Sequence, residues 1–600
     1  MTEGTNQGLG VAAIVLAVVH CAWQSLAFAA GPAEEGTTMT KSDSVRVLYV
    51  YEFANRGTPA AYDEALAVAC LQGIANREGP LVYVVSSTSV RPSYWLDIFS
   101  REKNWLCNRN QKHVSGLDAL VEIVGDHLKG AIIWDPEVPA TINVASTIAG
   151  VRSGVVLSPE LANQCLPKWK LPVIEDLRGR FDGTESGSKK NEAYRWAIRE
   201  YLAKGLCSSH LLCLFEDANK VRDEGGIGYA VTRDWAVMNR AFVFDLSPWG
   251  DEAPKDDPNQ PLGTDLETYR MILRETLKHS AGKQMTELTG FFSFWKYSNV
   301  PGYASRHEPV PTEWETVYLI SPYNCYQNTI SSDCYNQSFH SQAPRRKLKQ
   351  RRPKPMDTVE KKAYVCILMA DYDSATPLYD FLPKFWDDSN RGKIPLAWGI
   401  NPNLIETYPD VITYLYETAT ENDHFTSDAS AAGYFNPNRI EPRYLPLLVK
   451  HNRRFFRATD MTIAPMVLDW DEPTPAVKDA FAKFAPDGYA TIVMDLHDTG
   501  GKTPKPHVWK GMPVTELIND TCNFVSPKQT SDAMYAALMS RGKAMPGFYF
   551  FRIVWTPPTA ILESLDTFRK EHPEIPIEVV DPYNFFALFE KYYERTPTTR

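Results

Sequence analysis

Short apolar runs alternate with helical patterns along almost the whole chain, and this alternation constrains the fold most. In the second half the runs are GFFSFW, YVCILMAD, IPLAWGIN, IAPMVLDWD, ATIVMDLHD, GFYFFRIVW and IEVVDP. Segments with helical patterns, such as PDVITYLYETATEN and PAVKDAFAKFA, separate them. Nearly continuous apolar strands alternating with helices are typical of parallel sheets that are covered on both faces. About seven such units predict a β/α barrel over residues 283–592.

An earlier series of the same kind occupies residues 45–265. Its apolar runs include RVLYVYE, PLVYVVSS, GAIIWD, GVVLSP, LLCLFED and AFVFDLSP. The loop at 247–265 is rich in Pro, Gly and Asp and therefore suits a linker. The sequence thus predicts an α/β protein with an N-terminal region of divergent repeats, followed by a C-terminal seven-stranded β/α barrel.

The composition is that of a large globular protein. The chain has 600 residues, of which 44% are hydrophobic and 23% charged. This length exceeds what one ordinary core accommodates, so two or more domains are expected. The net charge of -10 gives no general attraction to nucleic acid, because binding to phosphates requires a surplus of Lys and Arg. We therefore expect neutral or small partners and no nucleic acid.

The first thirty residues predict export. The apolar run LGVAAIVLAVVHCAWQSLAFAAG ends in Ala27-Phe28-Ala29, the small-x-small pattern that signal peptidase cleaves. The segment before this run has no Lys or Arg, and His20 lies inside the run, so an uncleaved anchor is the alternative. We expect residues 1–30 to be a signal peptide and the mature protein to be periplasmic or secreted, without stable insertion in a membrane.

Polar residues follow several of the apolar runs, and this placement predicts the site. Asp371 and Asp373 come directly after the run that ends at Ala370. Others occupy similar positions after later runs: Asn401, Asp469, Asp471, Asp495, His497, Asp498 and Trp555. Active sites of β/α barrels lie at the carboxyl ends of the strands, so these side chains should converge. Carboxylates interleaved with tryptophans suit a site that binds sugar hydroxyls and stacks on sugar rings. A capping or turn role for the Asp-x-Asp pair is the alternative interpretation.

Several segments resemble the GxGYxYP family of glycoside hydrolases. SAAGYFNP is similar to the motif that names the family: Gly433, Tyr434 and Pro437 stand at motif positions, whereas Ala431 replaces its first glycine and Asn436 its second tyrosine. MADYDS is similar to the MADGDN block of the family. LQGIANREGPLVYV and IEVVDPYNFFALF are similar to its N-terminal and C-terminal segments. The likeness therefore spans most of the mature chain.

This resemblance implies both a fold and a pair of catalytic residues. The family fold has three divergent N-terminal repeats and a seven-stranded barrel, with the site in the cleft between them. The two aspartates of the MADGDN block correspond to Asp371 and Asp373. Within this block Tyr372 replaces a glycine and Ser374 an asparagine. We expect these departures to crowd the cleft or to alter the hydrogen bonds that orient Asp373.

The resemblance also implies a catalytic glutamate, which falls in the segment HEPVPTEWETVYLI. Three candidates occur there, Glu308, Glu313 and Glu315. We favour Glu313, because the neighbouring indole of Trp314 could desolvate the acid and raise its pKa. The expected reaction is glycosidic hydrolysis with this glutamate as general acid and the two aspartates as base and orienting carboxylate. The residues expected to bind the carbohydrate are Trp314, Trp398, Gly433, Tyr434 and Trp470.

Other activities stay open alongside this one. A glycan-binding protein that keeps the barrel but lacks catalysis is the main alternative. A polysaccharide deacetylase would require zinc-binding histidines, and the twelve histidines form no HxxxH pair. A glycosyltransferase could use Asp-x-Asp to hold a metal and a sugar nucleotide, which an exported protein rarely meets. We therefore expect neither a metal nor a cofactor.

A basic run, RRKLKQRRPKP at 345–355, precedes the MADYDS segment. It could contact an acidic polysaccharide, and a solvated loop is the simpler interpretation.

Overall fold

The structure is a computed structural model in which residues 45–600 form one compact unit. The predicted signal peptide and Trp470 lie outside the residues that it describes. The described residues are 47–53, 57–87, 89–215, 222–223, 225–292, 296–297, 307, 309–330, 332–469, 472–493, 500–521, 526–542 and 544–595.

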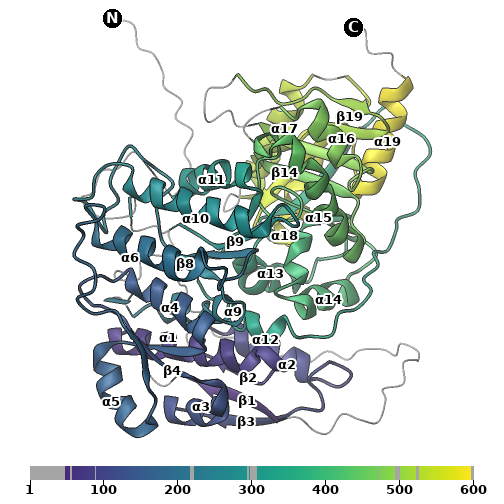
Figure 1. The fold of residues 1–600 in the computed structure, drawn as a ribbon. Helices are drawn as coiled ribbons and strands as arrows, with labels where there is room; N and C mark the ends of the chain where they lie inside the picture. The colour runs from purple at the N-terminus through teal and green to yellow at the C-terminus, as the bar shows by residue number, and fades with distance from the viewer. Residues whose placement is uncertain are drawn as a thin grey trace, which may run out of the picture. The chain divides into compact units, whose positions relative to one another are not determined.

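Three parallel sheets are built from the first part of the chain (Figure 1). The first has the order β2-β1-β3, with β1 (Val47–Glu52), β2 (Val82–Val85) and β3 (Asn110–Val114). The second has the order β5-β4-β6, with β4 (Gly130–Ile133), β5 (Gly154–Leu157) and β6 (Val173–Asp176). The third has the order β10-β9-β7-β8, with β7 (Leu211–Leu214), β8 (Phe242–Phe244), β9 (Thr286–Gly290) and β10 (Cys325–Asn328).

The third sheet continues across the predicted linker at 247–265. Strand β9 pairs in parallel with β7 on one side and with β10 on the other. The linker segment therefore connects two strands of one sheet, and the domain bounds drawn from the sequence stay a prediction.

Helices cover these sheets, among them α1 (Pro59–Ala75), α2 (Arg91–Ser100), α4 (Thr141–Arg152), α6 (Lys189–Ala197), α10 (Thr264–Ser280), α11 (Pro309–Ile320) and α12 (Gln337–His340). The start of α1 is set by Thr58, whose side chain accepts a hydrogen bond from the Ala61 N–H, and by Pro59 in the first turn. All but a few residues of α1 are buried, because other elements cover it on every side.

The centre of the C-terminal part is β11 (Ala363–Ala370), in which every residue is buried. Alternate side chains of this strand point to opposite faces. Val365 and Ile367 belong to the main hydrophobic core, whereas Cys366 packs in a second cluster with Phe585 and Phe586 of α19 (Pro582–Arg595). Burial on both faces explains why the sequence of β11 is apolar without interruption.

Two further sheets contain the remaining strands. One has the order β13-β12-β11-β19-β18, with β20 also paired to β11, and the other has the order β14-β15-β17-β16. Their strands are β12 (Leu396–Gly399), β13 (Asp423–Thr426), β14 (Ile463–Asp469), β15 (Gly488–Val493), β16 (His507–Trp509), β17 (Met512–Glu516), β18 (Ile518–Thr521), β19 (Gly547–Val554) and β20 (Ile577–Val579). Every pairing is parallel except the β16–β17 hairpin.

The two C-terminal sheets adjoin at two places. The Ser427 N–H, just after β13, donates to the Ile463 carbonyl at the start of β14 at 3.4 Å. Only Leu517 separates β17 from β18. Strand pairing among the described residues defines two sheets rather than one closed barrel, and the α/β class with parallel sheets is as predicted.

The C-terminal helices alternate with these strands: α13 (Leu382–Trp386), α14 (Pro409–Thr418), α15 (Leu445–Ala458), α16 (Pro475–Phe481), α17 (Pro527–Ser540), α18 (Pro558–Glu571) and α19. Several begin with proline in the first turn, where the missing N–H has no intrahelical partner to lose. In the part of the chain that is described, no helix is both long and apolar enough to cross a membrane.

Candidate active site

Three aspartates meet beyond the carboxyl ends of β11 and β13. Asp371 and Asp373 follow β11, and Asp428 is the second residue after β13. One carboxylate oxygen from each lies within 4.8 Å of those of the other two. Asp373 and Asp428 are buried, whereas the side chain of Asp371 is 31% exposed. The carboxyl ends of parallel strands gather residues that are distant in sequence, and this brings Asp428 to the Asp-x-Asp pair.

Asp371 is fixed by both its backbone and its side chain. Its φ of +65° lies in the left-handed region, which is strained for a residue other than glycine. The Asp371 N–H donates to Asp428 Oδ2 at 2.8 Å, and the Trp555 indole N–H donates to the Asp371 carbonyl at 3.0 Å. The guanidinium of Arg552, on the neighbouring strand β19, forms an ion pair with the Asp371 carboxylate. These contacts hold the Asp371 carboxylate in one position, beside Arg552 and partly facing solvent.

Asp373 lies deeper and has a different environment. Its Oδ1 accepts a hydrogen bond of 2.6 Å from the Tyr434 hydroxyl. Burial raises the pKa of Asp373 well above its usual range, and the negative charges of Asp428 and Asp371 raise it further. The Tyr434 hydroxyl and Arg552 oppose this rise without cancelling it. Asp373 therefore favours its neutral, protonated form.

Asp428 is completely buried and forms hydrogen bonds with Asn401 and Asp371. Its N–H donates to Asn401 Oδ1 at 3.0 Å, and its Oδ2 accepts from the Asp371 N–H. Burial is the main cause that raises the pKa of Asp428 to about 6, with Arg552 acting against the rise. A Cβ on Gly399, the last residue of β12, would lie 2.7 Å from Asp428 Oδ2. The close approach of this carboxylate therefore requires glycine at 399.

The loop that carries the signature segment SAAGYFNP is held by backbone hydrogen bonds to β10. The Gln327 N–H donates to the Tyr434 carbonyl at 2.7 Å, and the Tyr434 N–H donates to the Gln327 carbonyl at 2.8 Å. Gly433 has a φ of +94°, and a Cβ there would lie 2.2 Å from Tyr326 Cδ2. Ala431 also has a positive φ, +82°, so this chain places alanine in a conformation that favours glycine. The loop geometry thus delivers the Tyr434 hydroxyl to Asp373.

Trp398 is fully buried rather than lining an open surface. Its indole N–H donates to Asp423 Oδ1 at 2.9 Å, and its ring packs against Tyr372 and Trp386. In this structure it presents no surface to a carbohydrate. Tyr372, the residue that replaces a glycine of the family block, is likewise buried and packs on Phe385. Its ring therefore fills the core and does not crowd the carboxylates.

Helix α11 borders the signature loop and carries the candidate glutamates 313 and 315. Trp314, on this helix, is partly buried and packs against a small cluster that includes Ala429 and Tyr434. The side chain of Glu313 and the whole of Glu308 lie outside the described residues, and Glu315 is partly buried. The choice among the three glutamates stays a prediction.

Of the other polar residues expected at the strand ends, Asn401 and Trp555 contact the aspartate cluster. Asp469 ends β14, but its side chain is outside the described part of the chain, as are Asp471, Asp495, His497 and Asp498.

Two residues of the cluster were not singled out from the sequence. Asp428 follows β13, whose sequence DHFT is polar, so no apolar run indicated a strand there. Its position shortly after a strand end matches that of Asp371, which is the signal that could have identified it. Arg552 is the one charged residue within the strand sequence GFYFFRIV, and a lone arginine in a buried strand is itself a sign of an ion pair.

The arrangement places a carboxyl group with a raised pKa beside one that is ion-paired with an arginine. Such a pair can donate a proton and supply a carboxylate to the same substrate. Three carboxylates this close can also provide oxygen ligands for a hard divalent cation, although Arg552 already supplies positive charge to Asp371. Acid/base chemistry and cation binding are therefore the two things that these residues can do.

Comparisons with known proteins bear on the fold and on the family. The model described as "GxGYxYP putative glycoside hydrolase C-terminal domain" matches residues 361–590, and the model of the "GxGYxYP_N second domain" matches residues 128–206. The chain matches none of the curated proteins.

One solved structure resembles the chain over nearly its full length. It is that of a "putative hydrolase" from Bacteroides thetaiotaomicron, 17% identical, with a TM-score of 0.66, covering 92% of this chain and 95% of that one. It shows that the two proteins share a fold. A "putative polysaccharide deacetylase" from Mycobacterium smegmatis, 11% identical, covers 42% of this chain and 98% of its own with a TM-score of 0.29, which supports no conclusion. On the two family matches, this chain belongs to the GxGYxYP family.

Proposed function

We propose that this protein hydrolyses glycosidic bonds, with Asp373 as general acid and Asp371 as nucleophile. The observation that carries the proposal is the contrast between these two neighbouring carboxyl groups. Asp373 is buried and its pKa is raised, whereas Asp371 is partly exposed and ion-paired with Arg552. Two carboxyl groups kept in different protonation states are what glycosidases use for acid and nucleophile. Membership of a glycoside hydrolase family supports the same reaction class.

The proposed reaction uses each group in turn. Neutral Asp373 gives its proton to the glycosidic oxygen as the bond from that oxygen to the anomeric carbon breaks. The Asp371 carboxylate bonds to the anomeric carbon and forms a glycosyl ester. Asp373, now charged, then takes a proton from water, and the resulting hydroxide displaces the ester and regenerates Asp371. The Arg552 guanidinium keeps the Asp371 carboxylate oriented between turnovers.

The separation of the carboxylates favours retention of configuration. Oxygens of Asp371 and Asp373 lie within 4.8 Å of each other. An inverting enzyme needs room for water between its two groups, which lie roughly 6.5–9.5 Å apart. We therefore propose a covalent intermediate rather than direct attack by water.

Asp428 acts as a positioning residue in this proposal. It accepts the Asp371 N–H and so stabilises the left-handed conformation that aims the nucleophile. Its charge is also one of the causes that raise the pKa of Asp373. Tyr434 acts from the opposite side by holding Asp373 Oδ1, which leaves Oδ2 as the atom that carries the acidic proton.

The remaining parts of the proposal concern fold, partner and location. The two adjoining C-terminal sheets support a seven-stranded barrel made of β11, β12, β13, β14, β15, the β17–β18 segment and β19.

Trp314 and Tyr434 are proposed to contact a poly- or oligosaccharide, because both lie at the loop beside the cluster. Glu313 is kept as a second candidate acid on α11. Export directed by a signal peptide over residues 1–30 is proposed from the sequence of the N-terminal segment.

The test is release of reducing ends by the purified protein from a panel of plant, microbial and host glycans. Asp371→Asn should lower kcat by about 10³-fold or more, because the nucleophile is lost. The matched control is Asp388→Asn, a half-buried loop aspartate that accepts hydrogen bonds from Asn390 and Thr559 and lies outside the cluster. Activity that Asp371→Asn leaves intact would overturn the assignment.

Two further arms separate the alternatives. Treatment with EDTA should leave turnover unchanged, and its loss would instead assign the three aspartates to a cation. Binding of glycans without release of reducing ends would show a glycan-binding protein that has kept the fold and lost the reaction.

A further inference from the structure

The outer face of α15 is a continuous basic surface on a protein of net charge -10. Lys450, Arg453, Arg454 and Arg457 all are exposed and follow one another at helical spacing. With Pro446 and Val449 they line a groove of about 340 Å³. On the opposite face of the helix, Asn452 Oδ1 accepts a hydrogen bond of 3.0 Å from the Ala432 N–H of the signature loop. The groove therefore lies outside the aspartate cluster, on the far side of the helix that braces it.

The basic run at 345–355 extends this surface. Asp460, at the end of α15, pairs with Lys349 at 2.7 Å and with Arg352 at 3.6 Å. The Arg345 guanidinium donates to the Ile405 carbonyl, beside the residue that pairs with Arg454. The basic run at 345–355 thus lies along the carboxyl end of α15 and adjoins the basic face of this helix. The combined surface has the following exposed cations: Arg345, Arg346, Lys347, Lys349, Arg351, Arg352, Lys354, Lys450, Arg453, Arg454 and Arg457.

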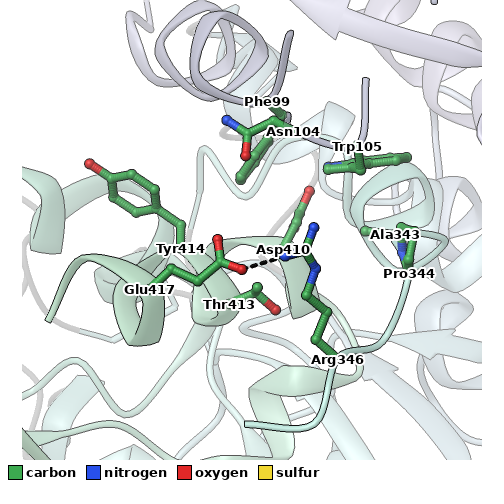
Figure 2. A pocket seen from close by; sticks show the side chains of 10 residues that line it. All are labelled: Phe99, Asn104, Trp105, Ala343, Pro344, Arg346, Asp410, Thr413, Tyr414 and Glu417. Atoms are coloured by element: carbon green, nitrogen blue, oxygen red, sulfur yellow. Dashed lines mark hydrogen bonds and ion pairs between the residues drawn. The ribbon is translucent and has the colours of Figure 1, made fainter. Parts of the chain in front are cut away.

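Few acidic groups neutralise these cations. Glu406 pairs with Arg454, Glu417 with Arg346, and Asp460 with two residues of the tract. Figure 2 shows the Arg346–Glu417 pair at a separate pocket of about 30 Å³, which has room for little more than one water molecule. Among the described residues no ion pair engages Lys347, Arg351, Lys354, Lys450, Arg453 or Arg457. A large surplus of positive charge therefore faces solvent.

Helix stability does not explain this arrangement. Cations are favoured in the last turn of a helix, but of the four on α15 only Arg457 lies there. Lys450 with Arg454, and Arg453 with Arg457, are like-charged pairs four residues apart, each of which costs about 0.2–0.5 kcal/mol. Their concentration on one face is therefore unfavourable to the isolated helix and favourable to a polyanion.

We propose that this basic surface binds an anionic polysaccharide, one that carries carboxylate or sulfate groups along its chain. The cations match the charge of such a chain, and Pro446 and Val449 provide apolar contact for the C–H face of a sugar ring. The groove is open along one face of α15, so a chain lying on it could contact residues of successive turns. The inference deepens the proposed function, on which the choice of a glycan as the polyanion rests. It assigns acidic glycans as the class of polysaccharide that this surface binds.

The test measures binding separately from hydrolysis. Affinity for polygalacturonate is measured by calorimetry on the full chain carrying Asp371→Asn, so that no substrate is consumed. The surface variant adds Lys347→Gln, Arg351→Gln, Lys450→Gln and Arg457→Gln, none of which breaks an ion pair of the described residues. The control removes four exposed cations elsewhere through Lys112→Gln, Lys170→Gln, Arg270→Gln and Arg274→Gln.

We expect the surface variant to lose affinity at least about tenfold and the control to stay within about twofold of the parent. Affinity should fall with added salt and be absent for neutral dextran, because the contacts are charged. Equal losses in both variants, or equal binding of polyglutamate and polygalacturonate, would overturn the proposal, since charge alone would then account for the binding. Binding that survives in the surface variant would overturn it as well. These binding measurements do not depend on turnover. They therefore test this proposal even if the protein releases no reducing ends and the proposed function fails.

Discussion

The Tyr434 hydroxyl donates a hydrogen bond of 2.6 Å to Asp373 Oδ1, across a separation of 61 residues in sequence. This bond joins the two segments that resemble the family motifs, SAAGYFNP and MADYDS. This bond lowers the pKa of Asp373, whereas the charge of Asp428 raises it. The acidity of Asp373 can therefore be moved either way by single substitutions around it.

Tyr434→Phe removes a hydrogen bond that lowers the pKa of Asp373. The pKa should rise, so the alkaline limb of kcat/KM, where the acid loses its proton, should move to higher pH. The measurement is the pH dependence of kcat/KM. Tyr326→Phe is the control, because its hydroxyl contacts Glu287 and not the cluster. A limb that moves equally in both variants would show that the Tyr434 bond does not set this pKa.

Asp428→Asn should move the same limb in the opposite direction. It removes a negative charge that raises the pKa of Asp373, so activity should be lost at lower pH than in the parent. Turnover should also fall by about tenfold, because the neutral amide oxygen of the variant accepts the Asp371 N–H more weakly than the carboxylate does. A shift to higher pH, or no shift with full loss of activity, would contradict a positioning role and point to direct participation in the reaction.

Asp373→Asn should make the protein more stable at neutral and alkaline pH. The folded pKa of Asp373 is raised, so the native state holds its proton more tightly than the unfolded chain does. Below the ordinary pKa of about 4 both states are protonated, and the parent and variant should be equally stable. As pH rises from there to the raised pKa the parent loses stability that the variant keeps, by about 1.4 kcal/mol for each unit of pKa shift.

The measurement is chemical unfolding of both proteins from pH 4 to pH 9. Asp388→Asn, a half-buried aspartate outside the cluster, is the control and should not reproduce the difference. A difference between Asp373→Asn and the parent that stays constant over this range would show that Asp373 does not titrate abnormally.

Gly433→Ala should destabilise the protein more than its backbone conformation alone explains. The φ of +94° costs about 1–2 kcal/mol for a residue with a Cβ, and the contact at 2.2 Å with the Tyr326 ring adds a further cost of about 1–3 kcal/mol. Gly542→Ala is a matched control, because its φ is +92° and a Cβ there meets nothing within 4 Å. The free energy of unfolding should fall more for Gly433→Ala. Equal losses would show that the loop moves away from Tyr326.

Local sequence patterns indicated the parallel α/β class and the position of Asp371 and Asp373 after a buried strand. They could do so because burial on both faces leaves a continuous apolar run, such as that of β11, and because a polar residue after such a run is visible in the sequence. Trp398 shows the limit of this reasoning. A tryptophan near a strand end is compatible with either a sugar platform or the core, and packing against Trp386 decided for the core.

The sequence was therefore sufficient for the strands with apolar runs, for the parallel α/β class, and for the resemblance to the family. The tertiary structure alone decided that Asp428 and Arg552 join Asp371, since their partners lie 57 and 181 residues away in the chain. It also decided that Asp373 is buried beside charges of the same sign while Asp371 faces an arginine. Secondary structure follows from local patterns of side chains, whereas the pKa of a carboxyl group depends on burial and on charges that only folding brings near it.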